Sequence, residues 1–175
     1  MIKTTIYVLA LSTIILNSGA IATPVTNQTF TSKSSYVLSD TFNIAASRID
    51  TATLEQSVFN QINNYRASQR LPALTRNSAI ENQARIHSQN MANGTVSFGH
   101  TGFSERVIAI GIPYRAAGEN VAYNQGYSDP ATIAVQGWLK SPGHLANIKG
   151  NYDKTGIGVA SNSRGAIYFT QIFLR

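Results

Sequence analysis

Residues 138–173 read WLKSPGHLANIKGNYDKTGIGVASNSRGAIYFTQIF. This stretch contains a helix start, and after it the pattern of apolar residues changes from that of a helix to that of strands. Ser141-Pro142-Gly143-His144 predicts an N-cap followed by the first three positions of a helix. Further on, residues 156–160 and 166–173 are short, mostly apolar runs. The turn residues Asn-Ser-Arg-Gly at 162–165 predict that the two runs pair as a hairpin.

Three further helices are predicted before this stretch. The first has apolar residues at spacings of three and four and is expected to end at Leu71, before Pro72. The second begins at residues 77–78 and stops at Gly94, and the third occupies residues 129–140, beginning with an Asp-Pro cap. The apolar stripes are Leu54, Val58, Ile62 and Tyr65 in the first helix, and Ile80, Ala84, His87 and Met91 in the second.

The first 22 residues have the three parts of a secretory signal peptide. Lys3 provides the positive start, an apolar run extends from Ile6 to Leu16, and Ala20-Ile21-Ala22 forms a small-x-small cleavage site before Thr23. The apolar run is shorter than the roughly 20 residues of an ordinary membrane span. We therefore expect cleavage and a secreted protein, extracellular or periplasmic, with no transmembrane segment afterwards; an uncleaved anchor is the alternative.

Residues 23–50 are rich in Ser, Thr and Asn and show no sustained period, which predicts a flexible leader with at most a short strand at 36–38. Residues 51–175 are expected to form the folded domain. Helices first and a hairpin last predict an α+β domain in which helices cover a sheet. Trp138 lies at helical spacing from Ile133 and Ala134, so we expect it to be buried.

The chain has a net charge of +6, or +5 without Lys3. This charge suits contact with an anionic envelope polymer or lipid surface, although scattered basic residues on a soluble domain are the simpler interpretation. Only Arg66, Arg70 and Arg76 lie close in sequence, with no aromatic residues between them, so nucleic acid is not an expected partner. The absence of cysteine excludes disulfides and thiol chemistry.

The three histidines differ in their surroundings. His87 lies on an apolar helical stripe and is predicted to be a core residue, whereas His100 lies in the loop sequence SFGHT, where it is free to point into a cleft. His144 lies at a helix start, whose partial positive charge lowers an imidazole pKa by up to about one unit from about 6.5. A neutral imidazole suits a metal ligand or a hydrogen-bond acceptor. A surface histidine that completes a cap is the alternative.

Glu119 follows a glycine in GENVA, a weak signal alone, but the order of motifs is specific. The chain has Asn63–Arg66 in its first helix and Leu-Pro-Ala-Leu at 71–74. The order then continues with FGH at 98–100, SER at 104–106, GENVA at 118–122, W..SPGH..NI at 138–148, GIGVA at 156–160 and YFTQIF at 168–173. Across residues 54–175 this closely resembles the bacterial, disulfide-free branch of the CAP (SCP) superfamily. Its other members include cysteine-rich secretory proteins, venom antigens and plant pathogenesis-related proteins.

The resemblance implies an α-β-α sandwich with a small antiparallel central sheet and a surface cleft. Eukaryotic members line that cleft with two histidines and two acids; His100 and Glu119 match the first of each. This chain departs from the pattern at Ser141 and Tyr168, which replace the second acid and the second histidine. We therefore expect a cleft formed by His100, Glu119, His144, Ser141 and Tyr168.

Two interpretations of this set remain open. His100, His144 and Glu119 match a zinc or other divalent-metal site with a water in the fourth position. Alternatively, a hydrogen-bonded network ties the GENVA segment to the SPGH helix start.

The preferred function is a secreted, non-catalytic module that binds a small, lipid or polymeric envelope ligand, as the family resemblance implies. A metal-assisted hydrolase acting on peptides or cell wall, with Glu119 as base, is one alternative, and an envelope structural protein is another. The sequence lacks HExxH, GxSxG and SxxK motifs and any cysteine nucleophile. A Ser-His-Glu arrangement built on Ser141 would require a proximity that the sequence does not establish.

Overall fold

The computed structural model describes residues 50–175. The predicted signal peptide, the strand expected at 36–38 and all of the leader except Asp50 lie outside the described residues. The described part opens directly with α1 (Thr51–Ser68), capped by the Asp50 carboxylate, which accepts from the backbone N–H groups of Ala52 and Thr53. None of the helices in residues 50–175 is long and apolar enough to cross a membrane.

A four-stranded sheet forms the centre of the domain, with strand order β1-β3-β4-β2. The hairpin β3 (Lys154–Ser161) and β4 (Ala166–Leu174) is antiparallel, as is the pairing of β4 with β2 (Ala117–Gln125). The two-residue strand β1 (Thr75–Arg76) pairs with β3 in parallel. The sheet is therefore mixed, whereas an antiparallel sheet was expected. The parallel strand β1 was not predicted, because its two residues are too few to show the alternating pattern of a strand.

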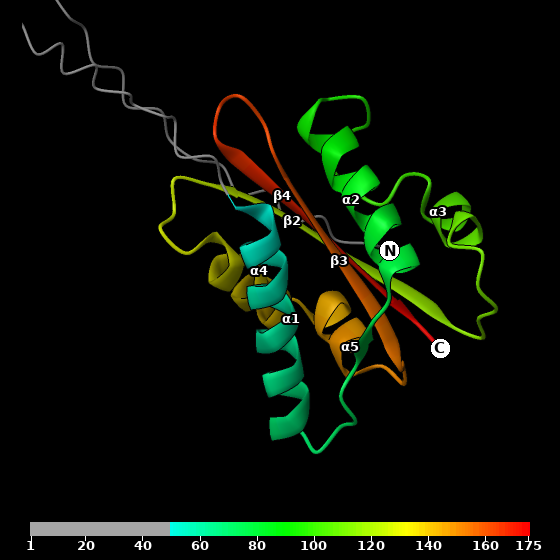
Figure 1. Cartoon of the computed structure of the whole chain (residues 1–175). Helices are drawn as coiled ribbons and strands as arrows, with labels where there is room; N and C mark the ends of the chain where they lie inside the picture. Colours follow the sequence, from blue (N-terminus) through cyan, green and yellow to red (C-terminus); the bar gives the residue numbers. More distant parts are fainter. Residues whose placement is uncertain (1–49) are drawn as a thin grey trace, which may run out of the picture. The chain divides into compact units, whose positions relative to one another are not determined.

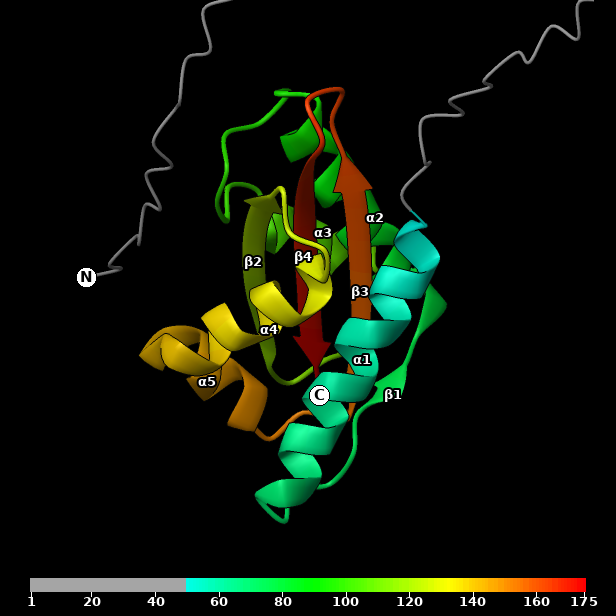
Figure 2. The ribbon, with the colours of Figure 1, turned by 90° about the vertical axis from the view of Figure 1, so that its left-hand side faces the viewer.

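Helices cover both faces of this sheet, which confirms the predicted α-β-α sandwich. One layer contains α1, α4 (Pro130–Lys140) and α5 (Pro142–Lys149), and the other contains α2 (Ser78–Ala92) and α3 (Phe103–Ala109). Figure 1 shows these layers on opposite sides of the strands. In Figure 2 the first layer lies in front of the sheet and β2 forms one edge.

The larger core lies between the sheet and the layer of α1, α4 and α5. Val58 and Ile62 of α1 and Phe169 and Phe173 of β4 are at most 1% exposed. Trp138 of α4 belongs to the same core, also 1% exposed, and its Nε1–H donates to the Val121 carbonyl at 3.0 Å. The predicted burial of Trp138 is confirmed.

The other layer depends on two glycines of β3. A Cβ atom at Gly156 or Gly158 would overlap the backbone of α2 near Glu81 and Arg85. Glycine at these positions lets α2 lie directly against the strand. The apolar side chains of this layer include Ile80, Ala84, Val107, Ile110, Ile172 and Leu174.

Some boundaries differ from the sequence expectation. Helix α1 ends at Ser68, three residues before Leu71, because Arg70 adopts the left-handed conformation with φ of 59°. Strand β2 and helix α3 have no clear sequence signal. Helix α3 is only seven residues long, and β2 buries polar residues such as Glu119 and Asn120, which obscure its period.

Candidate functional site

The candidate site lies at the β2 edge of the sheet, between the loop that precedes α3 and the start of α5. Glu119 is the third residue of β2, His100 lies in the loop before α3, and His144 is the third residue of α5. The ring centroids of His100 and His144 are 6.4 Å apart, with the ring planes inclined by 43°. The structure therefore brings together all three residues of the predicted set.

The Glu119 carboxylate is buried and fully engaged. Its side chain is 1% exposed, and the Arg106 guanidinium of α3 donates to both oxygens at 2.8–3.0 Å. His100 Nδ1 lies 3.0 Å from Oε1. A two-pronged guanidinium–carboxylate pair of this kind compensates a buried charge.

This contact determines the hydrogen-bonding state of His100. A carboxylate can only accept, so Nδ1 carries the proton, and in the neutral ring Nε2 retains its lone pair. The His100 side chain is 39% exposed. Glu119 thus orients His100 from behind while the ring remains accessible to a ligand.

His144 is half-buried, and burial lowers its pKa below the usual value, with the nearby His100 as a second cause. The direction agrees with the sequence expectation, but the leading cause is desolvation rather than the helix start. Ser141 is the N-cap of α5 by backbone conformation, yet its side chain makes no capping hydrogen bond.

A hydrogen-bonded network also joins the GENVA strand to the SPGH helix. Asn120 Nδ2 donates to the His144 carbonyl at 3.2 Å. Asn147 Nδ2 donates to the Glu119 carbonyl at 3.0 Å and to Asn120 Oδ1 at 2.9 Å. The network expected as the alternative is therefore present, but it is built from asparagines and backbone carbonyls rather than from the histidine rings.

Tyr168 lies in an aromatic row rather than against the histidines. It stacks on Tyr123, its direct partner across the β2–β4 ladder, with centroids 5.6 Å apart, and Phe98 meets Tyr123 edge-on at 5.2 Å. Tyr123 and Glu119 are four positions apart along β2, roughly 13 Å in an extended strand.

Residues 59–173 match the cysteine-rich secretory protein family, CAP. The chain belongs to the CAP family. Two proteins of Bacillus subtilis (strain 168) are similar to it. The uncharacterized membrane protein YlbC is 32% identical over 128 residues, covering 70% of this chain and 35% of YlbC. The uncharacterized protein YkwD is 33% identical over 125 residues, covering 69% of this chain and 46% of YkwD.

A solved CAP structure is also similar. It is an extracellular SCP-domain protein of Bacillus anthracis str. Ames, with a TM-score of 0.60 at 27% identity. The match covers 71% of this chain and 41% of that protein. This chain therefore spans less than half the length of each of these three relatives.

His100 and His144 do not form a complete metal cage with Glu119. Within residues 50–175, no group of three or more His, Asp or Glu side chains is arranged to hold a metal ion. The Glu119 oxygens already accept from Arg106 and His100. Glu119 is therefore already occupied by protein partners, and the three-ligand zinc site stays a prediction.

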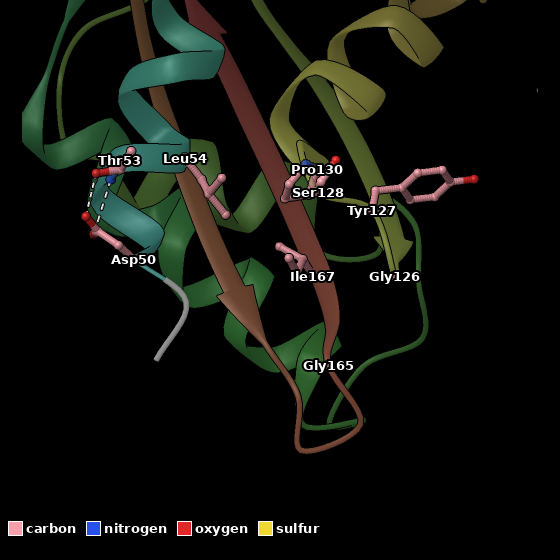
Figure 3. Close-up of a pocket in the computed structure, with 9 residues that line it drawn as sticks. All are labelled: Asp50, Thr53, Leu54, Gly126, Tyr127, Ser128, Pro130, Gly165 and Ile167. Atoms are coloured by element: carbon pink, nitrogen blue, oxygen red, sulfur yellow. Dashed lines mark hydrogen bonds between the residues drawn. The ribbon is translucent and has the colours of Figure 1, made fainter. Parts of the chain in front are cut away.

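A surface hollow of about 380 Å³ lies elsewhere in the CAP domain, at the far end of β2 (Figure 3). Leu54 and Ile167 provide apolar lining, whereas the ring of Tyr127 points away from them in Figure 3. Neither His100, Glu119 nor His144 lines it. Its full lining is Asp50, Thr53, Leu54, Gly126, Tyr127, Ser128, Pro130, Gly165 and Ile167.

Sequence reasoning missed three residues of the site: Arg106, Asn120 and Asn147. Arg106 ends the SER motif at 104–106, but nothing local in the sequence pairs it with a carboxylate 13 positions away. The two asparagines belong to the GENVA and W..SPGH..NI motifs. Their place in these motifs is the signal by which they could have been found.

Proposed function

We propose that this CAP protein is a non-catalytic, extracellular ligand-binding module whose site is the His100–His144 pair. Its family and the extracellular B. anthracis relative support a role outside the cytoplasm. The signal peptide predicted at residues 1–22 supports the same location.

The observation that carries the proposal is the 3.0 Å contact between His100 Nδ1 and Glu119 Oε1. This contact orients the accessible His100 ring and leaves its Nε2 lone pair available to a ligand. His144 lies beside His100, and its lowered pKa favours the neutral form of its ring. Imidazoles in their neutral form suit a divalent metal such as zinc, or a ligand with hydrogen-bond donors.

If a divalent metal binds, His100 and His144 would hold it, and the metal would supply a Lewis-acid centre for a ligand oxygen. Glu119 would act as the carboxylate that fixes the tautomer of a metal-binding histidine. Arg106 would keep that carboxylate in place.

Glu119 is poorly suited to the general-base role that a hydrolase would require. A base must present a lone pair to the proton it removes, whereas both Glu119 oxygens accept from Arg106 and one also accepts from His100. We therefore prefer binding over hydrolysis. Chelator-sensitive cleavage of peptides or cell-wall fragments by the purified protein would contradict this preference.

Calorimetric titration with zinc tests the site directly. Wild-type protein should bind, and His100→Ala and His144→Ala should each lose most of the heat. Affinity should fall steeply below about pH 6, because protons compete with the metal for imidazole. Tyr168→Phe is the matched control, because it keeps the stacked ring outside the histidine pair. Equal binding by all four proteins would remove the metal-binding interpretation.

A further inference from the structure

The backbone around His100 is held at three consecutive carbonyl groups. The Gly99 carbonyl accepts from His87 Nε2 at 2.8 Å, and the His100 carbonyl accepts from Phe103 N–H at 3.1 Å. The Thr101 carbonyl accepts from Arg106 Nη1 at 2.7 Å. Phe103 and Arg106 belong to α3, which follows the loop, whereas His87 belongs to α2, which precedes it. His87 therefore links His100 to the helix that lies on the sheet.

The loop depends on such contacts because two glycines flank His100. Gly99 has φ of 145° and Gly102 has φ of 77°. Glycine adopts positive φ without steric cost but has many other conformations available. The local sequence alone therefore does not fix the direction of the His100 side chain.

Helix α2 provides a fixed reference for the loop. Its backbone lies against Gly156 and Gly158 of β3, and Ser88 Oγ makes 2.8 Å hydrogen bonds with the Gly158 carbonyl and Thr170 Oγ1. His87, next to Ser88, is 2% exposed, and burial lowers its pKa. Because its partner is a carbonyl, Nε2 of His87 carries the proton.

We propose that His87 is a positioning residue: it fixes the Gly99 carbonyl so that His100 Nδ1 meets Glu119, and thereby sets which His100 nitrogen is available to a ligand. Its consequence for binding rests on the proposed function, whereas its effect on the His100 tautomer does not require a ligand. His87 remains a core residue, as its helical spacing predicts, but one whose polar atom acts on the site.

The test compares variants that differ only in the donor. His87→Leu removes the N–H, and His87→Met is a second donor-free variant whose flexible side chain fills the site more adaptably. His87→Gln restores an N–H at a similar reach. Ser88→Ala is the matched control, because it removes a buried hydrogen bond from the same helix that leads to the sheet rather than to the loop.

Nitrogen-15 NMR of the imidazoles at pH 8 provides the first measurement. Wild type, Ser88→Ala and His87→Gln should show His100 with its proton on Nδ1. The donor-free variants should show a mixture of the two tautomers. A folded donor-free variant with the wild-type His100 signal would overturn the proposal.

Zinc calorimetry provides the second measurement. The donor-free variants should bind about 10–100-fold more weakly, the range for loss of a residue that orients a ligand, while His87→Gln and Ser88→Ala retain wild-type affinity. Failure of the wild type to bind zinc would contradict the metal role of the site. The NMR result would then still decide whether His87 positions His100.

Discussion

At the scale of single residues, the stability of the domain should be sensitive to substitution of the buried Arg106–Glu119 pair. Arg106→Leu leaves a carboxylate uncompensated in a site where its side chain is 1% exposed, which should cost about 3–5 kcal/mol of unfolding free energy. Urea denaturation measures this change. The double variant Arg106→Leu with Glu119→Gln should recover part of the loss, because no buried charge then remains.

An exposed arginine provides the control for this prediction. Arg164 lies in the β3–β4 turn, and Arg164→Leu should stay within about 0.5 kcal/mol of wild type. A loss below about 1 kcal/mol for Arg106→Leu would mean that Glu119 does not depend on this partner.

Trp138 affects stability through its packing more than through its hydrogen bond. Trp138→Ala should cost about 3–5 kcal/mol, because it opens a cavity between α4 and the sheet. Trp138→Phe keeps much of the ring and should cost less, about 1–3 kcal/mol for the unpaired Val121 carbonyl. Thermal melting of both variants checks the order, and an unchanged melting temperature for Trp138→Ala would contradict the packing role.

Residues that form the site were predictable to different degrees. His100, Glu119 and His144 come from motifs whose order resembles the CAP family, and the structure brings them together. Arg106 was not predicted, because its pairing with Glu119 depends on where α3 lies in the folded domain rather than on local sequence spacing. Glu119 was predicted as a metal ligand, but its carboxylate accepts hydrogen bonds from Arg106 and His100, and local sequence did not reveal the contact with Arg106.

At the scale of elements, the contact between α2 and β3 can be tested with one type of substitution at two sites. Gly158→Ala places a methyl group against the α2 backbone and should destabilise the domain by about 1–3 kcal/mol. Gly137→Ala lies within α4, with no atom within 4 Å of the new Cβ, and should stabilise it by about 0.5–1 kcal/mol. Equal effects in chemical denaturation would show that α2 can move away from the strand.

The helices with caps and the final hairpin were readable from sequence because their signals are local. Asp129 caps α4 and Asn77 caps α2, as expected. Strand β2 was not readable, because the polar residues on its two faces are satisfied by distant partners: Arg106 for Glu119 and α5 for Asn120. A strand stabilised in this way has no alternating apolar pattern.

At the scale of the whole molecule, buried His87 and half-buried His144 make stability depend on pH. Burial is the leading cause of a lowered pKa for both His87 and His144, so the fold favours their neutral forms. The unfolded chain titrates near pH 6.5, so it takes up these protons first as the pH falls. The contribution of these two histidines to the free energy of unfolding should therefore be fully present above about pH 6.5 and should decline below it.

Melting temperatures at pH 7.5 and pH 5 measure this decline. Three exposed carboxylates with lowered pKa, those of Asp50, Asp129 and Asp153, lose their stabilising contribution only in more acidic solution. The combined variant His87→Gln with His144→Gln should flatten the curve between these two pH values. An unchanged slope would contradict the assignment of this dependence to the two histidines.

The side chains that reach β2 from the helices affect how this edge strand can pair with another protein molecule. An edge strand offers backbone groups to which a second chain could add, the first step of aggregation. On β2, Asn147 and Trp138 occupy the carbonyls of Glu119 and Val121. Helices α4 and α5 thus shield the middle of the edge from a foreign strand. A foreign strand that paired at these two positions would first have to break both side-chain hydrogen bonds.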